Sequence, residues 1–402
     1  MTTISPKRKN ALEIALFTMT QRARSFTNML TEMPPKVAVG DKKDEERQTS
    51  SHAPIVRITD LSKTSGDMVD MQVVMQLNKL PTMGDRKISG RGEDIDFSTF
   101  EMMINQGRHQ VDSGGKMSQQ RTTHHLEKTG RSLLGSYFNN IQDQQTTVQL
   151  AGARGDFEDK GTIVPLATHS EFSDIMINPV SAPSYDNHFF GGDATSFTTL
   201  DSADVFSLEA VDNINLHLEE MSSPIQPIRY TGDEMAGDEP FYLLYVTPRQ
   251  WADWLQTTSY KDWQSLTAAA LTRSRNFKHP VFSGEVAMRG RILVRKYMGM
   301  PIRFNAGSNV SVSNNDDAAT VTDQTAGVKI DRAMLLGGQA LGTAWGHTSG
   351  PNAFSMHTER TDANNRSETT IAWMNGSKKI RFADKNGRVN DHGVMVLDTA
   401  VS

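Results

Sequence analysis

The stretch from Gly66 to Gly152 constrains the fold more than any other part of the sequence, because it has the pattern of a two-stranded ribbon followed by a long helix. Alternating apolar residues mark the first arm of the ribbon: Val69, Met71, Val73, Met75 and Leu77. The returning arm alternates at Ile95 and Phe97, then out of phase at Phe100, Met102 and Ile104. A period of two is typical of a half-buried strand. The change of phase predicts a β-bulge near Ser98 or Thr99.

The segment between the two arms, Lys79 to Asp94, is charged and rich in glycine. It predicts an exposed tip, whose candidate contact residues are Gly84, Asp85, Arg86, Lys87, Arg91, Glu93 and Asp94. At ~3.3 Å per residue, an arm from Met68 to Leu80 reaches ~43 Å. Because a two-stranded ribbon alone is only marginally stable in water, we expect it to lie on a partner, and we expect that partner to be another copy of the chain.

The region after the ribbon has the pattern of one long helix. No proline interrupts Met117 to Ala151. Apolar residues recur at helical spacing at Leu126, Leu133, Leu134, Tyr137, Phe138, Ile141 and Val148. At ~1.5 Å per residue this helix is ~50 Å long, and Gly152 is expected to end it. A reaching ribbon joined to a long helix indicates an assembly protein.

A second amphipathic stripe lies near the N-terminus. Its apolar residues are Leu12, Leu16, Met19, Ala23, Phe26 and Leu30. Polar residues from Lys36 to Ser51 indicate a linker. The stripe predicts a docking arm, with Leu12, Leu16, Met19 and Phe26 as docking residues, on the chain's own body or on a neighbouring copy. Membrane binding is a weaker alternative, because Glu13 and the net charge oppose it.

The rest of the sequence predicts a mixed α+β unit from about His169 to Gly350, followed by a set of C-terminal strands. In the α+β unit we expect helices at Ser202–Met221, after Thr247-Pro248 and at Asp262–Arg275. We expect strands there at Phe241–Val246, Ile292–Val294, Pro301–Phe304 and Ala333–Leu336, and a polar loop at Asn305–Gly327. In the C-terminal set, Asn375-Gly376 predicts a hairpin between Thr369–Met374 and Lys379–Phe382, and Asn386-Gly387 a second turn before Gly393–Leu397. We expect the C-terminal strands to pack on the long helix.

Composition and motifs exclude several classes of protein. The chain has 402 residues, which favours two or three domains, and no cysteine, which excludes disulfides, thiolate catalysis and cysteine-ligated zinc. Its net charge of −5 argues against a dedicated nucleic-acid-binding protein. The sequence shows no catalytic, cofactor or metal motif: Gly114–Ser118 lacks the phosphate-loop signature, and His124-His125 lacks the other residues of a zinc protease. No signal peptide or membrane span is expected.

Six strings of residues resemble the major capsid proteins of podophages similar to phage N-four. They are Arg91–Glu101, Ile104–His109, Gly114–Arg121, His188–Phe197, Leu243–Trp251 and Lys379–Arg388. The resemblance runs from about Thr59 to the C-terminus. It implies the Hong Kong ninety-seven capsid fold, of class α+β, in which an N-terminal arm and an extended E-loop reach neighbouring subunits. It also implies a peripheral domain that carries a spine helix, and an axial domain.

Mapped onto this sequence, the resemblance implies an arm and linker at 1–51, the E-loop and its flanks at 52–115, the peripheral domain at 116–168 and 351–402, and the axial domain at 169–350. The implied function is a structural, non-enzymatic shell protein, assembled in the host cytoplasm into hexamers and pentamers of an icosahedral virion head around double-stranded DNA. Decoration, portal and scaffolding proteins are further expected partners. The family's covalent cross-link is not carried over, because nothing in the sequence pairs the residues it needs.

A shell around DNA needs an inner face that is neutral or basic, for which the candidates are Lys7, Arg8, Lys9, Lys116 and Arg121, with Lys128 and Arg131 nearby. Any such contact would be to phosphates. The alternative is a solvated or ion-paired helix face, with Glu127 as one partner. Two other functions stay open at this point: an encapsulin-like compartment that holds a cargo enzyme, and a soluble α+β enzyme.

Overall fold

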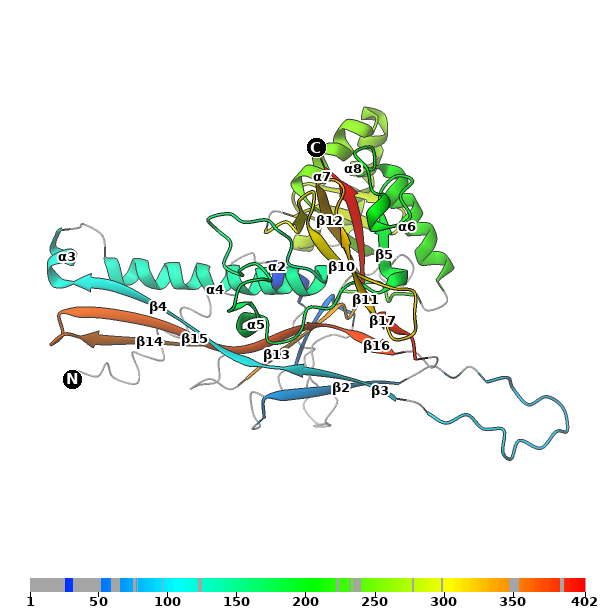
Figure 1. The fold of residues 1–402 in the computed structure, drawn as a ribbon, viewed down its shortest axis with the longest axis horizontal. Coiled ribbons are helices and arrows are strands. Elements are labelled where there is room, and N and C mark those ends of the chain that lie inside the picture. The colour runs from blue at the N-terminus through cyan, green and yellow to red at the C-terminus, as the bar shows by residue number, and fades with distance from the viewer. Residues whose placement is uncertain are drawn as a thin grey trace.

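The structure, a computed structural model, describes residues 26–31, 52–58, 66–74, 77, 79–95, 97–121, 125–221, 224–230, 233, 240–276, 278–297, 299–346, 354–383 and 387–401. It has two main parts (Figure 1). One is an elongated blade, in which a long helix lies along a sheet. The other is a rounder unit built on a second sheet. The ribbon leaves the junction of the two parts and points away from the blade.

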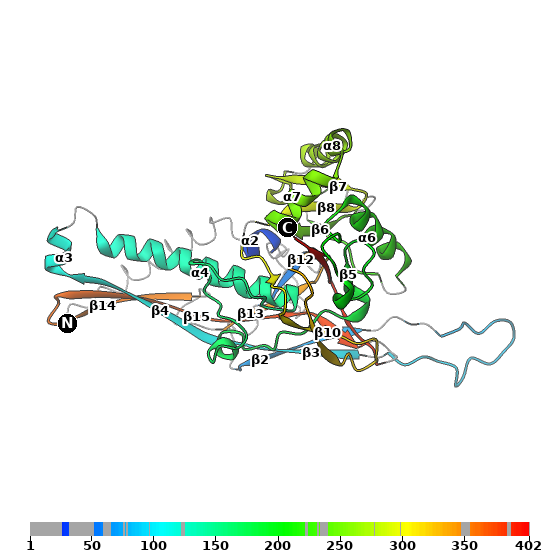
Figure 2. The same cartoon turned by 45° about the horizontal axis from the view of Figure 1, so that its top comes forward.

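The blade sheet has five strands in the order β1-β13-β15-β14, with β4 on the other edge of β15. The strands are β1 (Ile55–Ile58), β4 (Asn105–Gly115), β13 (Leu341–Trp345), β14 (Phe354–Thr361) and β15 (Arg366–Lys379). Figure 2 shows α4 lying along one face of this sheet. Leu134, Phe138 and Ile141 of α4 pack there against Trp373 of β15 and Phe354 of β14.

The predicted single helix is wrong at its start and correct at its end. The structure has a short α3 (Lys116–Arg121) and then α4 (Leu126–Ala151), and His125 precedes α4 with an extended backbone. Gly152 ends α4 in the left-handed conformation, at φ 66°. Leu133, predicted on the buried side, is 60% exposed. Its spacing fits the apolar stripe, but Leu134 is the leucine that packs against the sheet.

The hairpin predicted at Asn375-Gly376 is also wrong, since β15 runs straight through both residues. The Asn375 side chain donates to Gln142 Oε1 of α4 at 2.8 Å. A Cβ at residue 376 would overlap with the Met103 carbonyl oxygen, so glycine is needed here for close approach rather than for a turn. The turn between β14 and β15 instead uses Asp362, Ala363 and Asn364, all at positive φ.

The second sheet has seven strands, in the order β5-β18-β12-β6-β8-β7 with β9 beside β12. The strands are β5 (His188–Phe190), β6 (Tyr242–Val246), β7 (Val286–Arg289), β8 (Ile292–Lys296), β9 (Arg303–Phe304), β12 (Ile330–Leu336) and β18 (Val394–Ala400). Its helices are α6 (Leu208–Glu220), α7 (Pro248–Thr257) and α8 (Tyr260–Asn276). As predicted, α7 begins at Thr247-Pro248. Its start carries a capping box, in which the side chains of Thr247 and Gln250 accept from each other's backbone amides.

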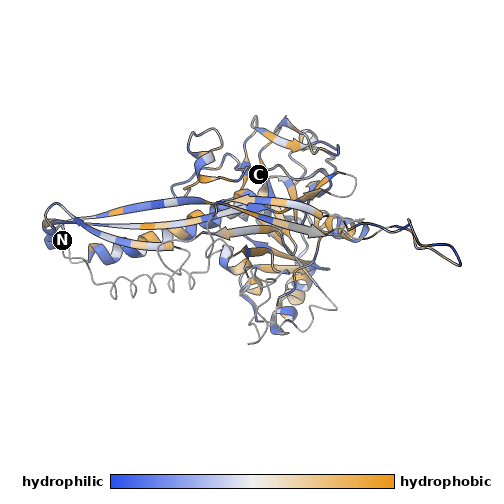
Figure 3. Ribbon diagram, turned by 90° about the horizontal axis from the view of Figure 1, so that it is seen from below, coloured by the Kyte–Doolittle hydropathy of each residue, from blue (hydrophilic) through white to orange (hydrophobic). Residues whose placement is uncertain are grey.

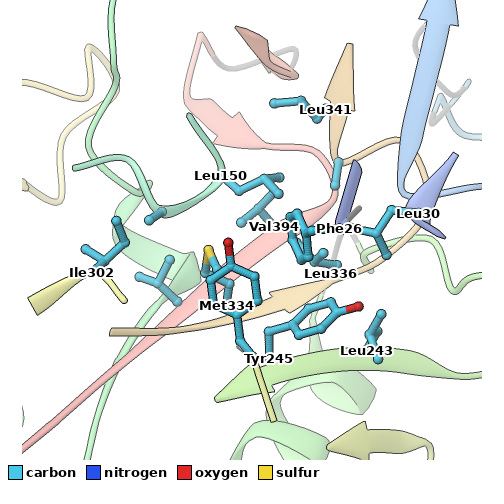
Figure 4. Packing of buried hydrophobic residues seen from close by; sticks show 14 of the residues in the cluster. Phe26, Leu30, Leu150, Leu243, Tyr245, Ile302, Met334, Leu336, Leu341 and Val394 are labelled. Carbon is cyan, nitrogen blue, oxygen red and sulfur yellow. The ribbon is translucent and has the colours of Figure 1, made fainter. Parts of the chain in front are cut away.

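The apolar run of β6 is continuous because both faces of this strand are buried. Leu243 and Tyr245 join one core cluster, while Tyr242, Leu244 and Val246 join another that contains residues of α6, α7 and α8. The first cluster also takes Leu150 of α4 and Leu341 of β13, so one core connects the blade to the second sheet (Figure 4). The two parts therefore share hydrophobic contacts at their junction.

The remaining elements are small. They are α2 (Phe26–Leu30), α5 (Phe172–Ile175), the 3-10 helices η3 (Tyr185–Asn187), η4 (Phe197–Thr199) and η5 (Pro280–Phe282), and three hairpins: β2 (Met68–Val74) with β3 (Phe97–Met103), β10 (Asn309–Ser313) with β11 (Val321–Thr325), and β16 (Arg381–Ala383) with β17 (Val389–Asp391).

Two further expectations need correction. The polar loop expected at Asn305–Gly327 contains the β10–β11 hairpin, because its Ser and Thr residues alternate with Val310 and Val312, which are buried. Of the C-terminal strands expected on the long helix, β15 packs on α4, whereas β18 belongs to the second sheet, where it pairs with β12 and β5. The turn before it, between β16 and β17, has Gly387 at φ 85° as the sequence predicted.

Candidate assembly surfaces

The ribbon is attached to the body through one of its faces. Phe100 and Met102 of β3 are buried with Ile58, Ala344 and Ile380, and Val69 and Met71 of β2 pack against this cluster. Lys378 strengthens the attachment, since its Nζ donates to the Glu101 carbonyl at 2.7 Å and lies 4.8 Å from the Phe100 ring centre. The predicted alternation therefore identifies the attached face correctly.

The bulge predicted at Ser98 or Thr99 is absent. The β2–β3 register runs without a shift from Met68↔Met103 to Val74↔Phe97. The phase changes because Phe97 points to the outer face, where it is 54% exposed, whereas Phe100 is 4% exposed. An exposed apolar residue thus produced the false signal.

The outer face of the ribbon is unusually apolar for an exposed surface. Met68 and Met103 stand opposite each other and are 47% and 42% exposed. On the same face, Asp70 stands opposite Glu101, and like charges in this arrangement are destabilising. Exposed apolar groups beside unfavourable charge pairs are typical of a surface that is covered in an assembly.

The loop between the strands extends beyond the body (Figure 1), and its described residues 77, 79–95 contain no strand. All predicted tip residues are exposed except Glu93, which is half-buried; Gly84 lies at φ 67°. Glu93 accepts from the Lys79 backbone amide at 2.7 Å, which holds the two sides of the loop together. Leu80, Met83 and Ile88 are 91%, 71% and 74% exposed. Figure 3 shows hydrophobic and hydrophilic residues along this loop.

Of the predicted docking residues of the arm, only Phe26 falls in the described part of the chain; Leu12, Leu16 and Met19 lie outside it. Phe26 begins α2 and is 6% exposed, with its ring 4.9 Å from that of Tyr245 and 5.0 Å from that of Tyr297. The end of the predicted arm thus docks on the chain's own core (Figure 4).

A carboxylate that sequence reasoning missed fixes this docking. Asp143 of α4 accepts from the backbone amides of Phe26 at 3.0 Å and Thr27 at 2.9 Å, and from the Thr27 hydroxyl at 2.8 Å. These amides lie in the first turn of α2, where the helix itself provides no carbonyl acceptor, and Asp143 supplies one. The available signal was a lone acidic residue between Gln142 and Gln144 in an otherwise uncharged part of the helix.

The predicted DNA-facing cations are only partly placed. Lys7, Arg8 and Lys9 lie outside the described residues. Lys116 and Arg121 are exposed on α3, at the end of the blade farthest from the projecting loop (Figure 1). Lys128 is exposed, whereas Arg131 is paired with Glu127 at 2.5 Å and donates to Thr358.

Buried ion networks, also missed by sequence reasoning, lie at the junction of the two parts. Arg332 and His188 both contact Asp398, each at 2.7 Å, and all three side chains are buried. Burial raises the pKa of Asp398, but the opposing attraction of Arg332 and His188 outweighs it and lowers this pKa to about 2. Burial lowers the pKa of His188. These groups face each other rather than a cavity, so they stabilise the fold.

Among the described residues, no cluster of three or more His, Asp or Glu side chains is arranged to hold a metal ion. No helix in the same residues has the length and hydrophobicity to cross a membrane.

A family model described as phage capsid protein matches residues 1–402, which is the whole chain. The chain belongs to the phage capsid protein family. Among solved structures, the capsid of Ralstonia phage GP4 is similar with a TM-score of 0.72 and 28% identity, over 92% of this chain and 95% of that chain. No curated protein sequence matches.

Two further solved structures share the fold at lower identity. The Cyanophage Pam1 capsid has a TM-score of 0.59 and 16% identity, over 92% of this chain and 96% of that one. The head of Helicobacter pylori bacteriophage KHP40 has a TM-score of 0.59 and 12% identity, over 95% and 99%. The expected capsid family and α+β fold are confirmed, and this capsid protein is a structural component of a homo-oligomeric phage shell, not an enzyme.

Proposed function

We propose that this capsid protein forms the hexamers and pentamers of an icosahedral phage head, assembled in the host cytoplasm, that encloses double-stranded DNA. The observation that carries the proposal is the ribbon, which extends past the body with Leu80, Met83 and Ile88 exposed at its end. The described residues of its own chain offer these side chains no surface to pack on. A neighbouring subunit in a closed shell supplies one.

The parts of the capsid fold are assigned as follows. The ribbon and its loop act as the E-loop; α4 with β4, β14 and β15 forms the peripheral domain; and the unit around the second sheet forms the axial domain. The boundaries predicted from sequence are kept with two changes, because β13 pairs with β15 in the blade and β18 lies in the second sheet. Leu12, Leu16 and Met19 are assigned to an arm that grips a neighbour, beyond the anchor at Phe26.

Deleting Thr82–Gly92 tests the role of the ribbon. We expect the variant to fold, because the described residues of this segment make no contact with the core, and to form no shells. Circular dichroism and tryptophan fluorescence report folding, while electron microscopy and sedimentation report particles. A second variant replaces Thr82–Gly92 with a Gly/Ser linker of the same length. It removes the side chains but keeps the length of the loop, so the two effects can be distinguished. Normal particles from both variants would contradict the proposal.

Particles purified from infected cells test the enclosed cargo. We expect nuclease-protected double-stranded DNA inside them. Portal, scaffolding and decoration proteins are assigned as partners of the assembled head, without a particular surface on this chain.

A further inference from the structure

A pocket of about 260 Å³ lies where α4, the start of β4, the middle of β15 and the segment 171–177 meet. A water molecule takes up ~30 Å³ in the liquid, so the pocket has room for a side chain. Part of its wall is apolar, formed by Ile141, Met176 and Trp373. Gly107 shapes this wall, because a Cβ at residue 107 would overlap with the Trp373 indole.

Three carboxamides of the pocket donate to backbone carbonyls of the chain itself. Gln149 Nε2 donates to the Asn178 carbonyl at 2.8 Å, Gln145 Nε2 to the Ile175 carbonyl at 2.9 Å, and Asn105 Nδ2 to the Asp174 carbonyl at 2.8 Å. Gln149 is 1% exposed, and its Oε1 is buried with no hydrogen-bond partner among the described residues. A buried acceptor left unpaired is destabilising. The described residues supply no donor for this oxygen, so a donor group that enters the pocket lined by Gln149 would satisfy it.

The rim of the pocket is negative. Glu171 and Asp174 line it, both are exposed, and neither has an ion-pair partner in the described part of the chain. No lysine or arginine lines the pocket. An apolar wall combined with acceptors and carboxylates suits a lysine or arginine side chain, whose hydrocarbon stem packs on the wall while its head donates hydrogen bonds.

The loop of the ribbon carries side chains of this kind. Arg86, Lys87 and Arg91 are exposed there, and none has an ion-pair partner within the described residues. Figure 1 shows the loop projecting beyond the end of the molecule opposite α3, away from α4 and α5, which border the pocket. No residue of the loop lines the pocket of the same chain. We propose that the pocket receives a basic side chain of the loop, from the segment Arg86–Arg91, of a second copy of this chain. This inference rests on the proposed shell function and names the surface that the ribbon meets.

Charge reversal with rescue tests the contact. The rim variant is Glu171→Lys with Asp174→Lys, and the loop variant is Arg86→Glu with Lys87→Glu and Arg91→Glu. Because juxtaposed like charges repel, we expect each variant alone to lose ~10-fold or more in particle yield, and the combined variant to recover most of it. The rim carboxylates bond nothing in the described residues, so folding is expected to be unchanged. No recovery in the combined variant would overturn the inference.

The absence of native cysteine allows a direct second test. In assembled particles, Asp174→Cys with Arg91→Cys, joined by a short bismaleimide, should give covalent oligomers on a denaturing gel. Ser132→Cys with Arg91→Cys is the matched control, because Ser132 is exposed on α4 but does not line the pocket. Equal linking in both pairs, or no linking in intact particles, would overturn the pocket contact and leave the shell function standing. Failure of the unaltered chain to form particles would instead overturn the shell function.

Discussion

At the scale of single residues, the ion pairs of this chain differ in how deeply they are buried, and we expect their contributions to stability to differ accordingly. Asp391 is 4% exposed and accepts from Lys379 and Arg381, each at 2.8 Å. Burial lowers the pKa of Lys379 to about 8, against the attraction of Asp391. Without the Asp391 carboxylate, the charged form of Lys379 would be further destabilised by its burial. By contrast, Asp212 and Arg289 form an ion pair in which both side chains are more than 40% exposed.

These two pairs give a prediction with its own control. Asp391→Ala leaves a buried cation unpaired, so we expect the free energy of unfolding to fall by ~3–5 kcal/mol. Asp212→Ala should change it by no more than ~1 kcal/mol. Urea unfolding of the purified chains, followed by tryptophan fluorescence, measures both. Similar losses from the two substitutions would contradict the assignment of Asp391 to the stabilising network.

His188 gives a pH-dependent prediction. Burial lowers its folded-state pKa below the usual ~6.5, so below that pH the unfolded chain binds a proton that the folded chain does not. A proton taken up only by the unfolded state costs ~1.4 kcal/mol of stability per pH unit. Stability should therefore fall as pH drops from 7 to 5. Asp398, with a pKa of about 2, adds stability that is lost at still lower pH.

We expect His188→Gln to flatten this pH dependence, because glutamine can donate to Asp398 but does not titrate. Part of the slope should remain, since burial also lowers the pKa of His392. Urea unfolding at pH 7 and pH 5 measures the slope. An unchanged slope in the variant would show that His188 does not carry it.

At the scale of elements, the anchor of α2 on α4 is a contact between segments more than 100 residues apart in the chain. Replacing Asp143 with alanine leaves the Phe26 and Thr27 amides without their acceptor. We expect a loss of ~1–3 kcal/mol and faster hydrogen exchange at these two amides. Asn140→Ala, at an exposed position of the same helix, is the control and should change neither quantity. Equal exchange rates in both variants would show that Asp143 does not anchor α2.

At the scale of the whole molecule, the ribbon and the blade point in opposite directions, so contacts between copies are made far from the shared core. The end of the blade, where Lys116 and Arg121 are exposed, is our candidate for contact with packaged DNA. Such contacts are to phosphates, and each contributes ~0.9 to the slope of log affinity against log salt concentration.

We therefore expect Lys116→Gln with Arg121→Gln to reduce that slope by ~2 for double-stranded DNA of arbitrary sequence. Lys261→Gln with Arg275→Gln, at exposed positions of α8, is the matched control and should leave it unchanged. Fluorescence anisotropy over a range of salt concentrations measures both. A slope that is reduced only by the α8 variant would place DNA at the other part of the molecule.

The sequence by itself determined the features that depend on neighbours along the chain. The buried strand β6, the start of α7 at Thr247-Pro248 and the stop at Gly152 were all predicted, because apolar runs, helix capping and left-handed glycine are local properties. The six resembling strings also indicated the capsid family correctly.

The tertiary structure decided what depends on distant partners. Asn375-Gly376 has the sequence of a turn, yet β4, β13 and β14 pair along β15 and hold it extended, and the Met103 carbonyl requires the glycine. The alternation of the sequence predicted that Phe97 is buried, whereas the β2–β3 register places it on the outer face of the ribbon. The pocket behind Trp373 and the carboxylate of Asp143 join residues from separate segments. A sequence pattern records which residues are apolar or charged, but only the packed chain determines which of them meet.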